Sequence, residues 1–165
     1  MWWSDRRRLI LGLAALPLAG CGFTPALAPG APAGALHGRI RADDPTDRAG
    51  VAFVARLEDR LGRPQAPGWR LGWQMTVTPE RLGLAAGLGE VRGRALGRVD
   101  WTLMGEGDDT PVASGRAEQF AGYDRTGTPL AIRAAAEDAQ DRVAGMLAEA
   151  VAAELIATAP RWAAP

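Results

Sequence analysis

Apolar and polar residues alternate with the period of a β-strand in two successive segments of the chain. Between residues 69 and 77, Trp, Leu, Trp, Met and Val occupy every second position, and most residues between them are polar. Residues 91–104 repeat this pattern with arginine, aspartate and threonine at the polar positions. A Gly-, Asp- and Pro-containing turn at 106–111 leads to a third segment at about 112–123. Because successive strands joined by short turns pair antiparallel, these segments predict a meander.

Two further segments carry apolar residues at helical spacing. The first is predicted to begin at Asp44, an N-cap acceptor followed by proline at the first helical position, and to end at Gly62. Thr128 and Pro129 form the same start signal for a second, longer helix whose apolar stripe is mostly alanine. A stripe of such small side chains predicts that this helix lies close to a sheet.

A weaker alternation at residues 35–41 predicts one more strand ahead of the first helix. The order β-α-β-β-β-α over residues 36–158 therefore predicts a single α+β domain, with two helices packed on one face of a four-stranded mixed or antiparallel sheet. The opposite face would be partly open.

Three arginines, Arg92, Arg94 and Arg98, lie on the polar side of the predicted second meander strand. Guanidinium groups bind phosphate as bidentate forks, so this row is a candidate surface for a ligand or a partner. A solvated sheet face explains the same arginines equally well, and the sequence leaves both interpretations open.

The first 20 residues have the parts of a secretory signal peptide: a basic head with three arginines, an apolar run at 9–18, and small residues before Cys21. The run is too short to span a membrane, which takes about 20 apolar residues. Leu18-Ala-Gly-Cys21 resembles the bacterial lipobox. This resemblance implies cleavage before Cys21, a diacylglyceryl group on its sulfur and an acyl group on the new amino terminus. It also implies a membrane anchor, and Gly22 favours the outer membrane.

The segments that flank the predicted domain should contribute no core. Residues 21–35 are rich in proline, glycine and alanine and carry no charge, so they predict a lipidated, semi-extended tether. Residues 159–165 are predicted to fray.

Charge and motif content narrow the possible functions. The chain has 19 basic residues, all of them arginine, and 19 acidic residues, so no net field points to nucleic acid. His37 is the lone histidine, with no second imidazole or thiolate to complete a metal site. The glycine-rich run at 83–93 lacks a P-loop pattern, and the Asp108-Asp109 pair is typical of a turn, although it could hold a cation. We expect no metal, no cofactor beyond the lipid, and no enzymatic activity.

The segment Leu18-Ala-Gly-Cys-Gly-Phe23, the element order, and the stretch Ala121–Ala131 running into Arg133–Arg142 together resemble the LPS-assembly lipoprotein family LptE. This resemblance implies an outer-membrane lipoprotein that faces the periplasm or a barrel lumen. Such a protein would bind the β-barrel protein LptD as a plug and assist delivery of lipopolysaccharide to the outer leaflet. It would carry out no covalent chemistry.

Two other functions stay open at this level. The first is an auxiliary lipoprotein of an ABC-type lipid transporter, which would share the small α+β build. The second is a lipid-tethered periplasmic enzyme, for which the sequence offers no nucleophile–base pair.

Overall fold

The computed structural model describes residues 31–82, 91–105, 107–108 and 110–163. Its regular elements include two 3-10 helices, labelled η. In chain order they are η1 (Pro32–Leu36), β1 (Ile40–Ala42), α2 (Arg48–Leu61), β2 (Trp69–Leu82), β3 (Arg92–Gly105), β4 (Pro111–Asp124), α3 (Pro129–Thr158) and η2 (Ala159–Arg161). The predicted glycine-rich loop after β2 lies largely outside the described residues.

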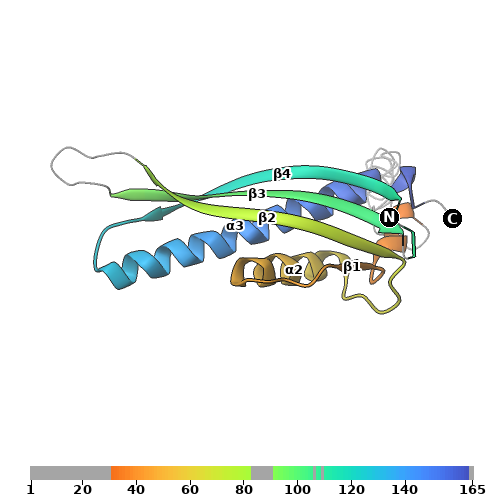
Figure 1. Ribbon diagram of the computed structural model, residues 1–165, viewed down its shortest axis with the longest axis horizontal. Helices are drawn as coiled ribbons and strands as arrows, with labels where there is room; N and C mark the ends of the chain where they lie inside the picture. Colours follow the sequence, from red (N-terminus) through yellow and green to blue (C-terminus); the bar gives the residue numbers. More distant parts are fainter. Residues whose placement is uncertain (1–30, 83–90, 106, 109, 164–165) are drawn as a thin grey trace, which may run out of the picture.

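The strands form one sheet in the order β1-β2-β3-β4. The short β1 pairs parallel to β2, whereas β2, β3 and β4 form an antiparallel meander of 14-residue strands. At roughly 3.4 Å per residue such strands are about 45 Å long, which gives the molecule the elongated shape in Figure 1. The predicted α+β fold and its β-α-β-β-β-α order are confirmed.

Both helices lie on the same side of the sheet (Figure 1). Thr128 caps α3 by accepting a hydrogen bond from the Ala131 N–H, and Pro129 follows it, as the sequence predicts. Four alanines of α3 are fully buried: Ala139, Ala144, Ala148 and Ala152. The approach is so close that a Cβ on Gly97 of β3 would overlap Val143 and Leu147. The absence of a side chain at Gly97 therefore allows α3 to approach the sheet this closely.

The first helix begins later than predicted. Its N-cap is Asp47, whose Oδ1 accepts a 2.7 Å hydrogen bond from the Gly50 N–H, and not Asp44. A Cβ on Gly50 would lie 2.9 Å from a carbon of the Trp73 ring, so a side chain would not fit there. Phe53 then packs on Trp73 with ring centroids 4.9 Å apart. The start of α2 is therefore in contact with β2. The local sequence around Asp44 and Asp47 does not reveal these contacts.

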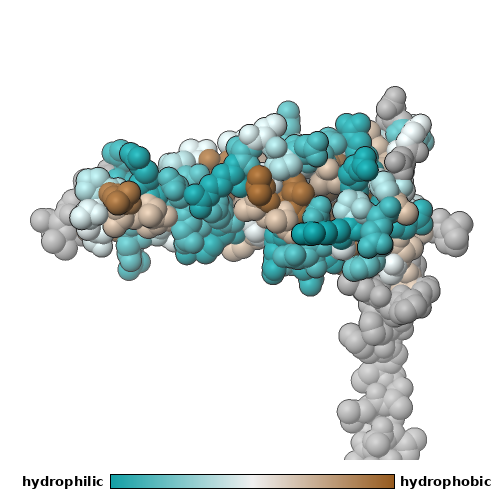
Figure 2. Space-filling model, turned by 90° about the horizontal axis from the view of Figure 1, so that it is seen from below, coloured by the Kyte–Doolittle hydropathy of each residue, from teal (hydrophilic) through white to brown (hydrophobic). Residues whose placement is uncertain are grey.

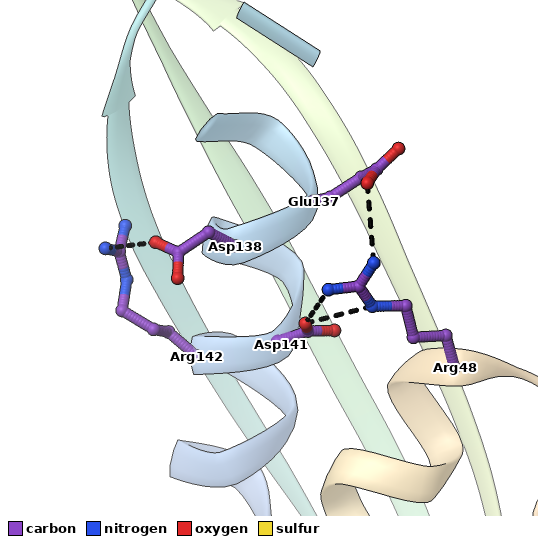
Figure 3. Close-up of polar contacts among 5 residues, drawn as sticks. All are labelled: Arg48, Glu137, Asp138, Asp141 and Arg142. Carbon is purple, nitrogen blue, oxygen red and sulfur yellow. Dashed lines mark hydrogen bonds and ion pairs between the residues drawn. The ribbon is translucent and has the colours of Figure 1, made fainter. Parts of the chain in front are cut away.

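Ion pairs fix α2 along α3. Arg48 at the start of α2 contacts Asp141 at 2.7 Å and Glu137 at 3.4 Å (Figure 3), and Glu149 contacts Arg56 and Arg60 farther along. The hydrogen bond with Asp141, helped by the charges of the nearby acids, raises the pKa of Arg48. The acidic residues in the middle of α3 thus serve to hold the two helices in register.

The chain ahead of α2 also differs from its prediction. The sequence predicts a tether up to residue 35 and a strand at 35–41, whereas the structure has the 3-10 helix η1 and a strand of three residues. Ala33 and Leu36 of η1 are buried, and Gly38 (φ 68°) turns the chain into β1. Leu36, which alternation assigns to a strand, is instead a core residue of a helical turn.

The C-terminal segment is docked rather than frayed, at least as far as residue 163. The Trp162 ring meets Trp69 edge to face with centroids 5.5 Å apart, and its Nε1 donates to the Thr158 hydroxyl at 3.1 Å. Ala159 and Ala163 are buried, and η2 packs against η1. Apolar contact with the first described residues therefore holds the end of the chain at the base of the sheet.

The helix from Pro129 to Arg161 is long and apolar enough to cross a membrane by length and composition. Its apolar residues include the core positions Val143, Leu147, Val151 and Leu155, all fully buried on the sheet. Packing within the domain accounts for this hydropathy.

Candidate partner surface

The sheet face opposite the helices is not covered by any described element. Along β2, β3 and β4 the odd-numbered side chains point toward α3, because they include the buried residues, and the even-numbered side chains point away. We call this second side the open face. Its long side chains are mainly polar or charged: Arg70, Gln74, Thr76, Thr78, Glu80, Arg92, Arg94, Arg98, Asp100, Thr102, Arg116, Glu118 and Asp124.

Charges on the open face pair across the strands. Arg94 contacts Glu80 of β2 at 2.8 Å. Arg98 lies 3.2 Å from Asp100 and 3.9 Å from Glu118, on β4. Asp100 also accepts a hydrogen bond from Arg116. The result is a ladder of alternating charge across three strands.

Asp100 lies at the centre of this ladder, and its neighbours shift its pKa. The hydrogen bond from Arg116, and to a smaller extent the one from Arg98, lower the pKa of Asp100. Asp100 therefore stays ionised on an exposed surface, and both neighbouring guanidinium groups share its charge.

All three arginines predicted as a candidate surface lie on the open face. Arg94 and Arg98 belong to the ladder, whereas Arg92 lies near one end of β3, opposite Leu82 and Asp124 in the neighbouring strands. The structure thus brings together Arg94, Arg98 and their carboxylate partners, and the predicted binding role of these residues stays a prediction.

The sequence did not identify the acidic residues of the ladder as partners of these arginines. Alternation already places Asp100 on the polar side of its own strand. Glu80 and Glu118 face their arginines only because of the strand register, Glu80 with Arg94 and Arg98 with Glu118. With these acids included, the open face is polar and nearly neutral rather than basic.

Two shallow hollows lie next to each other on the open face. Their volumes are about 560 and 510 Å³, and both are bordered by Gln74 and Asp100. The first extends over Gly72, Thr102 and Ser114, and the second over Thr76, Thr78 and Leu96. Short side chains on β2 and β4 beside the long charged residues create these depressions, so the face offers a line of hydrogen-bonding groups.

An apolar pair interrupts the polar surface toward the far end of the sheet. Leu96 and Phe120 are direct cross-strand neighbours on the open face, and Phe120 is 64% exposed. On the opposite side of the molecule Figure 2 shows a mainly hydrophilic surface with separate apolar patches, one of them over the far end of α3, where Leu130 is 77% exposed. The two most exposed large apolar residues of the described chain, Phe120 and Leu130, thus lie toward the end of the sheet away from η1 and η2.

Candidate chemistry elsewhere is limited among the described residues. No group of three or more His, Cys, Asp or Glu residues with a metal-binding arrangement occurs in the described part of the chain. Asp108 accepts the Thr110 N–H at 2.9 Å, which lowers the pKa of Asp108 and matches a turn; Asp109 lies outside the described residues. His37 lies beside Gly62. The expectation of a non-enzymatic protein stays a prediction.

The lipidation site predicted at Cys21, together with the signal peptide, lies outside the described residues. The first described residue, Ala31, precedes η1 at the base of the sheet, so the segment that contains Cys21 joins the domain at that end.

The fold recurs in solved bacterial proteins. No protein-family model matches the chain, and no curated protein matches it by sequence. A protein of Caulobacter crescentus CB15 assigned as a lipoprotein has a TM-score of 0.63 and 25% identity, covering 78% of this chain and 96% of its own. Rare lipoprotein B of Shewanella oneidensis (TM-score 0.56, 12% identity) and a minor lipoprotein of Acinetobacter baumannii (0.52, 12%) each cover 73% of this chain and 93% and 91% of their own. The chain thus has the fold of solved bacterial lipoproteins from three genera.

Proposed function

We propose that the protein is an outer-membrane lipoprotein of the LptE type. Anchored through lipids on Cys21, it would bind an LptD-like β-barrel as a plug and assist the export of lipopolysaccharide to the outer leaflet. The lipobox and the fold shared with bacterial lipoproteins support the anchor and the class. The open face is the observation that supports a barrel partner.

The composition of the open face suits the inside of a barrel. The lumen of an outer-membrane barrel is polar, and the wall presents side chains that donate and accept hydrogen bonds. On the open face, hydroxyl and amide groups line the hollows, and each ladder charge already has a partner within the chain. Such a face can lie against a polar wall without leaving a charge buried and unmatched, which would be costly.

Purification from the native envelope tests the partner. The full-length, C-terminally tagged protein is extracted in mild detergent, and co-purifying proteins are identified by mass spectrometry. We expect a large outer-membrane β-barrel at near one-to-one stoichiometry. Recovery of inner-membrane transporter subunits instead would replace the proposal with the auxiliary-lipoprotein function.

Site-specific cross-linking tests the surface. A photoreactive amino acid replaces Thr76, exposed on the open face, and in a matched variant it replaces Ala55, exposed on α2. We expect the Thr76 probe to cross-link to the barrel at least several times more efficiently. Equal efficiency from both positions would contradict the assignment of the open face as the main contact.

The anchor has a separate test. Cys21→Ser should abolish labelling with radioactive palmitate and leave the precursor uncleaved, because the serine hydroxyl does not accept the diacylglyceryl group. Normal palmitate labelling of this variant would overturn the lipid anchor while leaving the fold assignment intact.

A further inference from the structure

The outer edge of β4 has no strand beside it among the described residues, since β4 is last in the sheet order. The Arg125 N–H donates to the Val91 carbonyl at 2.9 Å, so this pair lies at a hydrogen-bonded position of the antiparallel ladder. Bonded and non-bonded pairs alternate in an antiparallel ladder. In β4 the odd-numbered residues therefore bond to β3, and Ser114, Arg116, Glu118 and Phe120 point their N–H and C=O groups outward.

Both ends of this edge are protected and its middle is not. Toward the far end, Arg142 of α3 donates to the Gly122 carbonyl at 2.9 Å and is itself held by Asp138 (Figure 3). At the base, Pro111 and a shift in register next to Met104 disturb the strand. Among the described residues of β4, only Ser114–Phe120 presents a regular edge with no strand beside it, and such edges form hydrogen bonds with any strand that reaches them.

We propose that, in copies not enclosed by a barrel, this edge pairs with β4 of a second copy of the chain, antiparallel and centred on Ala117. In that register Arg116 lies opposite Glu118 of the second copy, and Glu118 opposite its Arg116. Moving the centre by one residue in either direction places arginine against arginine or glutamate against glutamate, which is destabilising. The order of charges along β4 therefore selects one register, in which about eight backbone hydrogen bonds form, two for each bonded pair.

The flank of α3 is compatible with this arrangement. Met146, Ala150, Ala153 and Ala157 follow Arg142 at helical spacing, so they share the face from which Arg142 reaches the edge of β4. Met146, Ala153 and Ala157 are exposed. The two-fold axis would run perpendicular to the sheet, so the second α3 would lie on the same side, and these small apolar residues let the two helices approach.

A single engineered cysteine tests the register. With Ala117→Cys in the full-length protein in its native membrane, the two sulfurs would face each other across the axis, where Cα atoms of a non-bonded pair are about 4.5 Å apart. We expect a disulfide-linked pair of chains under mild oxidation. In the matched variant Ala121→Cys the two cysteines would be roughly 27 Å apart, so no link should form. The parent chain controls for any link through Cys21.

Co-expression gives a second arm to this test. Chains with Ala113→Cys and chains with Ala121→Cys should link to each other, because these positions face each other in the proposed register, but neither should link to itself. Self-linking of Ala121→Cys as efficient as that of Ala117→Cys, or linking of Ala117→Cys to a different protein only, would overturn the proposal.

Proline separates edge pairing from folding. Because the Glu118 N–H points outward, Glu118→Pro removes no hydrogen bond of the sheet but blocks one to a second copy. At equal protein concentration in detergent we expect light scattering to show at least a tenfold smaller dimer fraction for Glu118→Pro, a smaller decrease for Glu118→Ala, and unchanged circular dichroism. Equal dimer fractions for Glu118→Pro and the parent would refute the edge contact. None of these results depends on recovery of a barrel partner.

Discussion

The two faces of β3 carry different residues and respond to different forces. Toward α3 the strand presents glycine, alanine, valine, tryptophan and leucine, all buried, whereas its open face presents Arg94, Arg98 and Asp100 in contact with neighbouring strands. Close packing determines which residues fit on the face toward α3, because the side chains there are buried. On the open face the order of charges determines which side chains pair. Water screens each of these contacts, so individual pairs contribute little to stability. Stability should therefore depend on one face and recognition on the other.

The largest contrast should come from two leucines of the same strand. Leu103 on the helix face is fully buried, whereas Leu96 on the open face is 37% exposed. Leu103→Ala should lower the free energy of unfolding by about 2–5 kcal/mol, because it leaves a cavity in the core. Leu96→Ala should cost about 1 kcal/mol or less. Urea denaturation of both variants measures this, and equal losses would show that the open face is also part of the core.

A smaller contrast comes from two glycines. A Cβ at Gly97 would overlap Val143 and Leu147, whereas at Gly72 on the open face it would meet its nearest atom, Asp43 Oδ2, at 3.5 Å. Gly97→Ala should therefore destabilise the protein by about 1–3 kcal/mol through overpacking. Gly72→Ala should leave stability nearly unchanged. If thermal melting ranks Gly72→Ala as the more harmful change, the close approach of α3 is not what limits the helix face.

The smallest effect should be electrostatic. Hydrogen bonds from Arg116 and Arg98 lower the pKa of Asp100, so its stabilising contribution is complete above the ordinary carboxyl pKa of about 3.9 and is lost as pH falls through the lower value in the folded protein. The melting temperature of the parent chain should therefore fall slightly more between pH 5 and pH 2.5 than that of Asp100→Asn. Identical pH dependence would show that the ladder adds nothing measurable to stability.

Local sequence signals predicted the elements whose boundaries depend on nearby residues. Alternation identified the first two strands of the meander, and the turn at 106–111 indicated the third. Thr128-Pro129 located the start of α3 because the cap is made within one turn. Asp44 and Asp47 carry similar cap signals, and the choice between them depends on how Gly50 fits against Trp73. That contact joins distant parts of the chain, so the local pattern could not decide it.

Only the arginines of the candidate surface, and not their pairing with acidic residues, were predictable from the sequence. The arginines of the open face follow from alternation, but the facing of Arg94 with Glu80 depends on a register that runs over 14 paired residues of two strands. Likewise, the docking of Trp162 on Trp69 joins segments 93 residues apart, and composition alone predicts a frayed end there.

Because η1 and η2 pack together, the first and the last described elements lie at the same end of the sheet (Figure 1). Under the proposed lipid anchor at Cys21 this end would be held, and the meander would extend about 45 Å from it at roughly 3.4 Å per residue. A tilt of about 10° at the held end would carry the far end through roughly 8 Å over that length. A partner that grips the middle of the sheet would remove this sweep, so loss of angular freedom at the Phe120 end is a sensitive indicator of complex formation.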